Sequence, residues 1–532
     1  MFRAAIVAAA LFVTVSGQSV PLDIAIVNIS AGGGGVFTGI APGRAPVGAI
    51  GIRGGRIVAM GPIGEVDAKD ARVVIDATGL TVAPGFIDVH SHGLETLGRA
   101  ELRNADAELA QGVTTIVGNP DGGGPVDLAK QRATLEGSGG IGVNVALLIG
   151  HGSVRSAVMG GANRAPTADE LAKMLALVRQ AVADGAFGMS SGIFYTPGRY
   201  AKTDELIALA HEAGGVYTSH IRDEGNYDAG VVASVDEVIR VAEDAKVTGI
   251  VTHMKALGPD SWGKSTTLIA HIDAARRRGA SVFADQYPYE ASSTSLAAAV
   301  LPGVTTADAR ARLADPAKKP ALLAEAKENI RRRGGPHSIA IASISSGAGR
   351  SASASAGASS LNGKRLDDIA AAKGVSPEQA AIDIILDGGA SIVSFNMSED
   401  DIRAIMRQPW TMTSSDGALS LPGEGVPHPR NNGAFARKFN VYVRDKVVEL
   451  DQALASMTSL PAQVFGFKDR GQLRVGAVAD IAIFDPAKVV DRATYANPHQ
   501  LATGMSYVIV NGQVAWRDGK GTGVRAGQVL RK

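Results

Sequence analysis

Histidines and one aspartate stand at the ends of several apolar segments of the sequence. His90 and His92 follow VAPGFIDV, His220 follows VYTS, His253 follows GIVT, and Asp416 follows WTMTSS. Residues two apart at the end of a strand share a face, so His90 and His92 can point the same way. Buried histidines often serve only to satisfy hydrogen bonds, but four of the ten in this chain end such segments. The pattern therefore predicts a metal site where the segments end.

The ligand types indicate which metal would bind and what it would do. Imidazole and carboxylate suit Zn²⁺, as one or two ions, and Mn²⁺ or Fe²⁺ would also fit because imidazole is not selective. A bound metal would lower the pKa of its water and polarise a carbonyl group. Asp416 could then take a proton from the attacking water and pass it to a leaving amine. It could instead be a purely structural ligand, or it could serve both roles.

These segments belong to a longer series, which predicts eight strands: VAPGFIDVH, GVTTIVGN, VNVALLIGH, FGMSSG, GGVYTSH, GIVTHM, SVFADQYPY and WTMTSSDG. Helical stretches such as ADELAKMLALVRQAVADG separate several of them, which indicates a parallel sheet covered on both faces. Eight such units predict an α/β fold with a (β/α)8 TIM-like barrel. An open doubly wound sheet would need a phosphate-binding turn, and neither AGGGGV nor DGGGP has the required glycine spacing.

The two ends of the chain have a different pattern from the centre. Short alternating apolar stretches broken by glycine pairs occur in residues 18–80 and again in 468–532, which predicts one small β-sandwich domain built from both ends. The barrel is then expected over residues 81–467. Residues 301–392 interrupt the alternation of strands and helices between strands seven and eight, and they include the low-complexity run SISSGAGRSASASAGASS. We interpret this insertion as a lid over the barrel mouth, with a surface excursion as the alternative.

Residues 1–17 have the order of a secretory signal peptide. Arg3 precedes an apolar run, and the small residues Ser16 and Gly17 follow it. This order predicts an exported protein, periplasmic or secreted, although a first core strand is the alternative. The run is short for a bilayer span, and no other segment suggests one. With 53 basic and 52 acidic residues, the charge also favours neither nucleic acid nor an anionic membrane as a partner.

Several motifs together resemble the amidohydrolase superfamily, and most closely its D-aminoacylase (N-acyl-D-amino-acid deacylase) branch: TVAPGFIDVHSH, YTSHIRDEG, THMK, YPYEASST, SSDG, HPR, GMSSGIFYTPGRYAKTDEL, MTSLPAQVFGF and LRVGAVADIAIFDP. The similarity covers about residues 22–530. It implies a barrel joined to a β-sandwich, and metal-dependent hydrolysis of the amide bond of N-acyl-D-amino acids to a carboxylic acid and a D-amino acid.

The resemblance also implies roles for particular residues. His220 and His253 match the ligands of the tightly bound metal, His90 and His92 a looser second site, and Asp416 the catalytic acid/base. The residues that match a site for the substrate's free carboxylate are Lys255, Tyr289 and Arg430. Without the family pattern, Lys255 and Arg430 would be read as surface charges and Tyr289 as a core residue. The expected partner is thus a small carboxylate-bearing substrate, and the sequence does not determine the oligomeric state.

One position departs from the family. The D-aminoacylases have a metal-binding Cys after strand two, but this chain contains no cysteine and Pro120 occupies that position. Asp121 could substitute if the turn is displaced. The change leaves other readings open: a dipeptidase, cyclic amidase or lactonase of the same superfamily, or a catalytically dead secreted binding protein. Metal content would separate the last of these from an enzyme.

Overall fold

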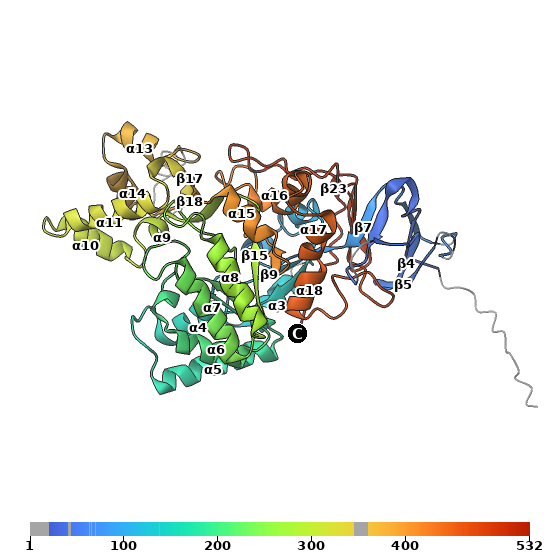
Figure 1. Cartoon of the computed structure of the whole chain (residues 1–532), viewed down its shortest axis with the longest axis horizontal. Helices are drawn as coiled ribbons and strands as arrows, with labels where there is room; N and C mark the ends of the chain where they lie inside the picture. Colours follow the sequence, from blue (N-terminus) through green and yellow to red (C-terminus); the bar gives the residue numbers. More distant parts are fainter. Residues whose placement is uncertain are drawn as a thin grey trace, which may run out of the picture.

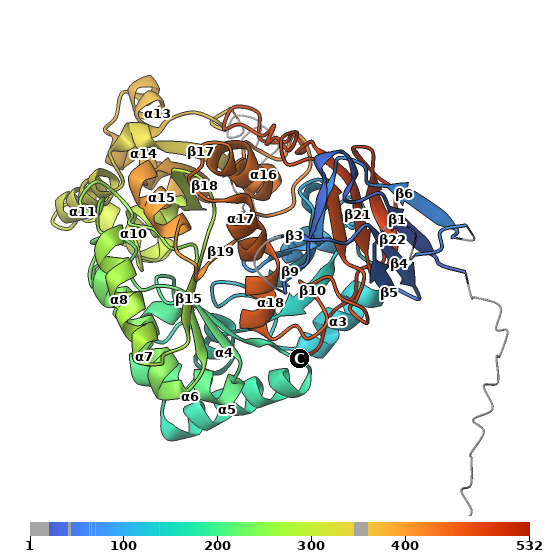
Figure 2. The same cartoon turned by 45° about the vertical axis from the view of Figure 1, so that its right-hand side comes forward.

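The computed structural model describes residues 21–532 except 41–43, 63, 65, 70, 138 and 345–359. A barrel forms the centre of the molecule, a β-rich unit lies at one side of it, and a mainly helical insertion lies on another (Figures 1 and 2). The predicted signal peptide lies outside the described residues, so export stays a prediction. No helix within the described part has the length and apolarity needed to cross a bilayer.

Eight parallel strands follow one another around the barrel in sequence order: β8 (Phe86–Asp88), β9 (Val113–Gly118), β10 (Asn144–Leu147) continued by β11 (Ile149–Gly150), β12 (Gly188–Gly192), β13 (Val216–His220), β14 (Thr248–Val251), β15 (Val282–Gln286) and β19 (Thr411–Thr413). The first and last strands meet just beyond their carboxyl ends, where the Asp416 amide donates to the His90 carbonyl at 2.9 Å. The predicted barrel class is confirmed.

Helices pack around the outside of the strands: α3 (Leu128–Gly137), α4 (His151–Met159), α5 (Ala168–Ala183), α6 (Thr203–Ala213), α7 (Val231–Ala245), α8 (Ser265–Arg277), α15 (Glu399–Met406), α16 (Arg430–Arg437), α17 (Leu450–Met457) and α18 (Ser459–Phe465). In α7, Val231, Val235 and Val238 are buried at the spacing of one helix face. Helix α5 begins with a capping box. The Thr167 side chain accepts a hydrogen bond from the Glu170 backbone amide, and the Glu170 side chain accepts one from the Thr167 backbone amide. Local sequence signals therefore account for these helices.

The chain ends form two packed sheets. One has the order β5–β4–β1–β6 and the other β23–β22–β21–β20–β7–β2–β3. Their strands are β1 (Ile24–Val27), β2 (Gly35–Phe37), β3 (Arg44–Ala45), β4 (Ala49–Arg53), β5 (Arg56–Gly61), β6 (Val73–Asp76), β7 (Thr81–Pro84), β20 (Ile481–Phe484), β21 (Met505–Val510), β22 (Gln513–Arg517) and β23 (Lys520–Gly521). A shared core of mostly isoleucine side chains joins the two sheets.

The predicted first barrel strand is in fact two strands. β7 pairs with β20 and β2 in the seven-stranded sheet, and only β8 joins the barrel. Gly85 lies between the two strands. This position requires glycine, because a Cβ here would collide with the side chain of Thr114 on β9. The expected boundary at residue 81 therefore assigned β7 to the wrong sheet.

The insertion between β15 and β19 starts earlier than predicted. Its own antiparallel sheet has the order β16–β18–β17, and its own apolar core holds the helices against that sheet. Its elements are β16 (Ala291–Ser295), α9 (Leu296–Val300), α10 (Thr306–Ala314), α11 (Lys319–Arg332), β17 (Ile339–Ile344), α13 (Leu366–Lys373), α14 (Pro377–Leu386) and β18 (Ala390–Phe395). β16 was missed because its sequence, ASSTS, is polar. Most of the low-complexity run lies outside the described residues, so a closing motion stays a prediction.

Candidate active site

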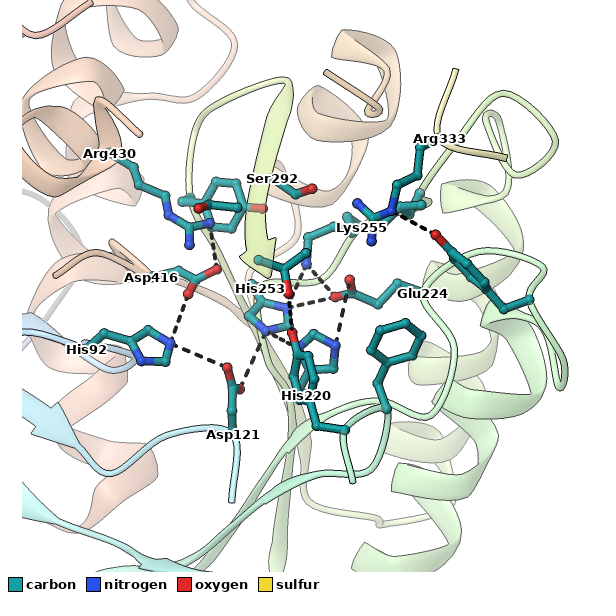
Figure 3. A pocket seen from close by; sticks show the side chains of 17 residues that line it. His92, Asp121, His220, Glu224, His253, Lys255, Ser292, Arg333, Asp416 and Arg430 are labelled. Atoms are coloured by element: carbon teal, nitrogen blue, oxygen red, sulfur yellow. Dashed lines mark hydrogen bonds and ion pairs between the residues drawn. The ribbon is translucent and has the colours of Figure 1, made fainter. Parts of the chain in front are cut away.

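A cavity of about 240 Å³ opens where the barrel strands end. Its lining combines carboxylates, imidazoles, cations and hydroxyl groups: His92, Asp121, Phe194, Tyr195, His220, Glu224, Tyr227, His253, Lys255, Leu257, Tyr287, Ser292, Ser293, Thr294, Arg333, Asp416 and Arg430. Figure 3 shows the labelled side chains converging from several strand ends and from the insertion. The carboxyl ends of barrel strands therefore carry the site, as predicted for this fold.

One cluster of candidate ligands joins the first and last strands of the barrel. Atoms of His90, His92, Asp121 and Asp416 all lie within 4.8 Å of one another. His92 Nε2 is 3.4 Å from Asp121 Oδ2 and 3.4 Å from Asp416 Oδ1. His90 Nε2 is 3.4 Å from Asp121 Oδ1, and neither of these two buried atoms has a hydrogen-bond partner within the described residues. Two buried polar atoms without hydrogen-bond partners, both of types that bind metals, fit a metal ion between them.

A second cluster shares Asp121 with the first. It consists of Asp121, His220 and His253, again with ligand atoms within 4.8 Å of one another. His220 Nδ1 and His253 Nε2 are 3.0 Å apart, and His253 Nε2 is 3.6 Å from Asp121 Oδ1. The four predicted histidines and Asp416 therefore come together, with Asp121 at the junction of the two clusters.

The turn after β9 explains why Asp121 reaches this junction when Pro120 does not. Asp121 has a φ of 54° and Gly122 a φ of 74°, so the chain turns sharply directly after the proline. Ser190 on β12 holds the turn, because its hydroxyl donates to the Asn119 carbonyl at 2.6 Å and accepts from the Gly122 amide at 3.1 Å. The structure thus favours the displaced-turn alternative, with a carboxylate one residue beyond the family's cysteine position.

Unusual backbone conformations are concentrated at the site. Ten non-glycine residues among those described have positive φ, and four of them are Asn119, Asp121, His253 and Asp416. Side chains rarely adopt this region, and such conformations persist only where the surrounding structure enforces them. For His253 part of the enforcement is visible, since its backbone amide donates to Asp285 Oδ1 at 2.9 Å. The surrounding structure therefore holds the backbone in a conformation that directs the side chains of Asp121, His253 and Asp416 into the cavity.

The charges of the cluster shift the pKa of its members in opposite directions. Burial opposes ionisation of Asp416, but the positive charges of Arg430 and His253 hold its pKa well below the usual range. Burial also lowers the pKa of His220 to about 4. For His253, burial and Lys255 oppose protonation, yet Glu224 and Asp416 raise its pKa to about 9. Asp416 is therefore an ionised carboxylate at neutral pH and can accept a proton.

Lys255 and Arg430 both enter the cavity wall, as predicted. Lys255 Nζ donates to Glu224 and lies 2.7 Å from His253 Nδ1. Arg430 Nη1 is 2.7 Å from Asp416 Oδ2, so the arginine also orients the acid. Both cations are buried, which excludes the alternative that they are ordinary surface charges.

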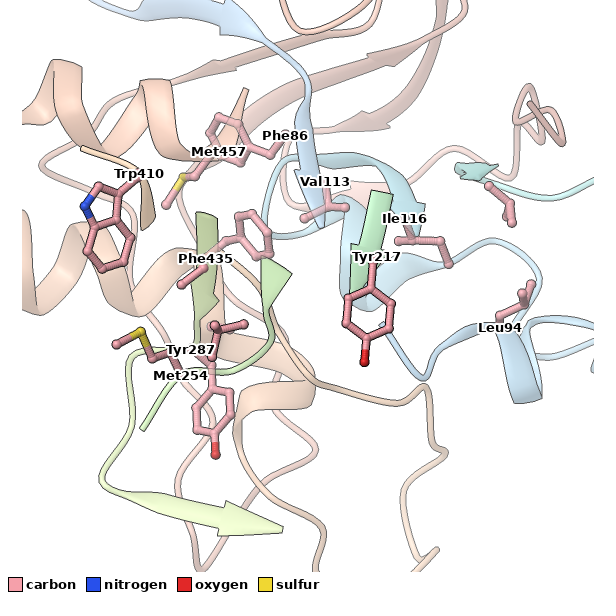
Figure 4. Packing of buried hydrophobic residues seen from close by; sticks show 14 of the residues in the cluster. Phe86, Leu94, Val113, Ile116, Tyr217, Met254, Tyr287, Trp410, Phe435 and Met457 are labelled. Atoms are coloured by element: carbon pink, nitrogen blue, oxygen red, sulfur yellow. The ribbon is translucent and has the colours of Figure 1, made fainter. Parts of the chain in front are cut away.

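Tyr289 does not take the predicted place in this wall. Its ring packs 5.0 Å from the ring of His428 and 4.8 Å from the Arg437 guanidinium, outside the cavity lining. Tyr287 lines the cavity instead, with the Arg430 guanidinium 4.6 Å from its ring, and it also belongs to the core cluster drawn in Figure 4. The sequence YPY offers two tyrosines, and only the path of the loop after β15 decides which of them faces the site.

Several further lining residues were not predicted individually. Glu224 lies in the quoted motif YTSHIRDEG, four residues after His220, and that spacing was the available signal. The hydroxyl-rich strand β16 belongs to the insertion, and its residues Ser292, Ser293 and Thr294 lie in the quoted motif YPYEASST. Arg333 also belongs to the insertion, and nothing local in the sequence distinguishes it from a solvated residue. The insertion therefore builds part of the cavity wall.

Comparison with known proteins agrees with this geometry. The sequence pattern of the amidohydrolase family matches residues 73–515. A D-aminoacylase of Alcaligenes xylosoxydans xylosoxydans is 33% identical, covering 97% of this chain and 99% of the relative. An N-acyl-D-glutamate deacylase of the same organism is 34% identical, covering 91% of this chain and 92% of the relative.

A solved structure shows the same fold with ligands bound. The crystal structure of N-acyl-D-glutamate deacylase from Bordetella bronchiseptica, complexed with zinc and a phosphonate mimic of the tetrahedral intermediate, has a TM-score of 0.78 and 33% identity. The match covers 96% of this chain and 100% of that one. Barrel, β-sandwich and sequence agree over almost the whole length, and the chain belongs to the amidohydrolase family, in its D-aminoacylase branch.

Proposed function

We propose that this chain hydrolyses the amide bond of N-acyl-D-amino acids in a metal-dependent reaction, releasing a carboxylic acid and a D-amino acid. The position of Asp416 carries the proposal. Its carboxylate lies between the candidate ligands His90 and His92 on one side and the Arg430 guanidinium on the other. An acid/base group is thus held between a metal site and a site for a substrate carboxylate, which is the arrangement that amide hydrolysis of an amino-acid derivative needs.

The ligand clusters suit one or two zinc ions. Asp121, His220 and His253 would hold one ion, and the cluster of His90, His92, Asp121 and Asp416 would hold another. Bound zinc would polarise the substrate carbonyl and lower the pKa of a water molecule. The donor set of imidazoles and carboxylates fits zinc, and the zinc complex of the deacylase structure described above supports that choice.

Asp416 would move the proton that the reaction requires. The oxygen of the attacking water would form a new bond to the amide carbonyl carbon while its proton goes to the Asp416 carboxylate. Asp416 would then deliver this proton to the nitrogen as the C–N bond breaks, so that a neutral amine leaves. Because Arg430 holds the other carboxylate oxygen at 2.7 Å, Asp416 keeps one orientation through both transfers.

The α-carboxylate of the substrate would bind between Arg430, Lys255 and Tyr287. Arg430 offers a fork of N–H donors above the Tyr287 ring. Lys255 has three N–H donors, of which one goes to Glu224. We assign Tyr287 to this role in place of Tyr289.

The test combines metal analysis with a paired substrate assay. Purified protein is analysed for metal, and amine release is measured from N-acetyl-D- and N-acetyl-L-amino acids with the same side chains. We expect stoichiometric zinc and release from the D-series alone. Metal without release from either series would contradict the deacylase proposal and favour a dipeptidase, cyclic amidase or lactonase. Neither metal nor release would favour a binding protein.

A further inference from the structure

Arg333 is a buried cation of the cavity wall that no carboxylate neutralises within the described residues. It follows α11 in the insertion and is 3% exposed, yet it lines the cavity. Its Nε donates to the Tyr227 hydroxyl at 2.7 Å, and its guanidinium lies 5.9 Å from the ring of the same residue. With its amide oriented to satisfy all its neighbours, Asn396 accepts from Nη1 at 3.1 Å. Both partners are uncharged.

The other two cations of the cavity differ from Arg333 in this respect. Lys255 is paired with Glu224, and Arg430 is paired with Asp416. Burying a charge without a counter-charge is costly, and removing water strengthens its attraction for an anion. An unpaired arginine held in a substrate cavity therefore indicates that the ligand supplies the missing negative charge.

The position of Arg333 indicates which part of the substrate carries that charge. Figure 3 shows Arg430 and Arg333 on opposite sides of the cavity, with Lys255 between them. A substrate whose α-carboxylate lies at Arg430 can extend its side chain toward Arg333. The wall beside Arg333 suits such a chain, because Phe194 and Tyr227 pack edge to face and present apolar surface for methylene groups. Hydroxyl groups on β16 add further hydrogen-bond donors.

We propose that Arg333 binds a second carboxylate, at the end of the substrate's side chain, so that the preferred substrates are N-acyl derivatives of acidic D-amino acids. The inference rests on the proposed deacylase function and specifies its substrate class. Overall similarity does not decide the matter, because the D-aminoacylase and the N-acyl-D-glutamate deacylase are 33% and 34% identical to this chain. The preference for acidic substrates is inferred from the unpaired guanidinium of Arg333.

The unmodified protein provides the first test. kcat/KM is measured for N-acetyl-D-glutamate against N-acetyl-D-glutamine, which have the same length and differ in charge. The aspartate and asparagine derivatives repeat the comparison with one methylene fewer. We expect the better acidic substrate to exceed its amide by roughly 10- to 100-fold, the range for hydrogen bonds to a charged group. Equal values for acid and amide overturn the inference while leaving the deacylase function intact. No release from any of the four overturns the deacylase function itself.

A variant then ties the preference to Arg333. Arg333→Gln should lower kcat/KM for the acidic derivative by roughly 10- to 100-fold and leave the amide derivative within a few-fold. Arg331→Gln is the matched control, because it removes the same charge from an exposed residue paired with Asp260 and Glu328. Equal losses on acid and amide would mean that Arg333 holds the α-carboxylate or the fold, and the inference would be wrong. If Arg333→Gln does not fold, the comparison in the unmodified protein still decides.

Discussion

Replacing Asp121 by alanine should weaken both metal sites together. Its two carboxylate oxygens face three imidazoles, at 3.4 Å from His90, 3.4 Å from His92 and 3.6 Å from His253. Asp121 is also the one residue that the two ligand clusters have in common. Losing a partner that only orients a ligand costs about 10- to 100-fold in metal affinity, so losing a shared anionic ligand should cost at least about 100-fold.

The measurement is competitive zinc titration with a chelator of known affinity, together with the metal content after dialysis. His92→Ala is the comparison, since His92 belongs to one cluster and not to the other. We expect His92→Ala to lose affinity at one site and Asp121→Ala to lose it at every site that the unmodified protein shows. Circular dichroism and the unfolding temperature control for folding.

A third variant tests the chemistry of the position. Asp121→Cys places a soft thiolate where the carboxylate lies and should raise the preference for zinc over manganese. If Asp121→Ala keeps the zinc affinity of the unmodified protein, the turn after β9 does not supply a ligand, and the reasoning from its geometry is wrong.

The remaining predictions concern catalysis, packing and pH. Asp416→Asn should lower kcat by roughly 10²- to 10⁴-fold while the zinc at Asp121, His220 and His253 stays bound; near-normal turnover would remove this acid from the mechanism. A Cβ at Gly192 would press into the Asp121 carbonyl, so Gly192→Ala should reduce zinc content, whereas Gly161→Ala, with nothing within 4 Å, should not; equal zinc in both would refute the packing argument. Burial lowers the pKa of Lys438 to about 7. Because the unfolded chain then binds more protons than the folded chain between about pH 7 and 10.5, this lysine should make the free energy of unfolding rise with pH there, by up to about 5 kcal/mol. Lys438→Met should flatten this rise, which is measured as the unfolding temperature at a series of pH values. An unchanged dependence of the unfolding temperature on pH would contradict the prediction.

Export stays a prediction from the pattern of residues 1–17. Sequencing the amino terminus of protein recovered from outside the cytoplasm of an expressing host would test it. A mature chain that starts near residue 18 is expected. Full-length protein retained in the cytoplasm would contradict it.

The sequence by itself determined the barrel and most of its ligands. His90 and His92 could be placed because strand periodicity puts residues two apart on one face, and because a parallel barrel brings all strand ends to one side. His220, His253 and Asp416 followed from the same rule. Each of these inferences needs only local pattern and a fold in which every unit repeats the same geometry.

Tertiary structure decided the residues that lie on loops or in the insertion. Asp121 reaches the ligand clusters only because Ser190, from a strand two units along the barrel, holds the turn after β9. The choice of Tyr287 over Tyr289 depends on the path of one loop. Arg333 enters the cavity because the insertion folds back over the barrel mouth. Contacts between segments far apart in the chain set these positions, and no local period in the sequence records them.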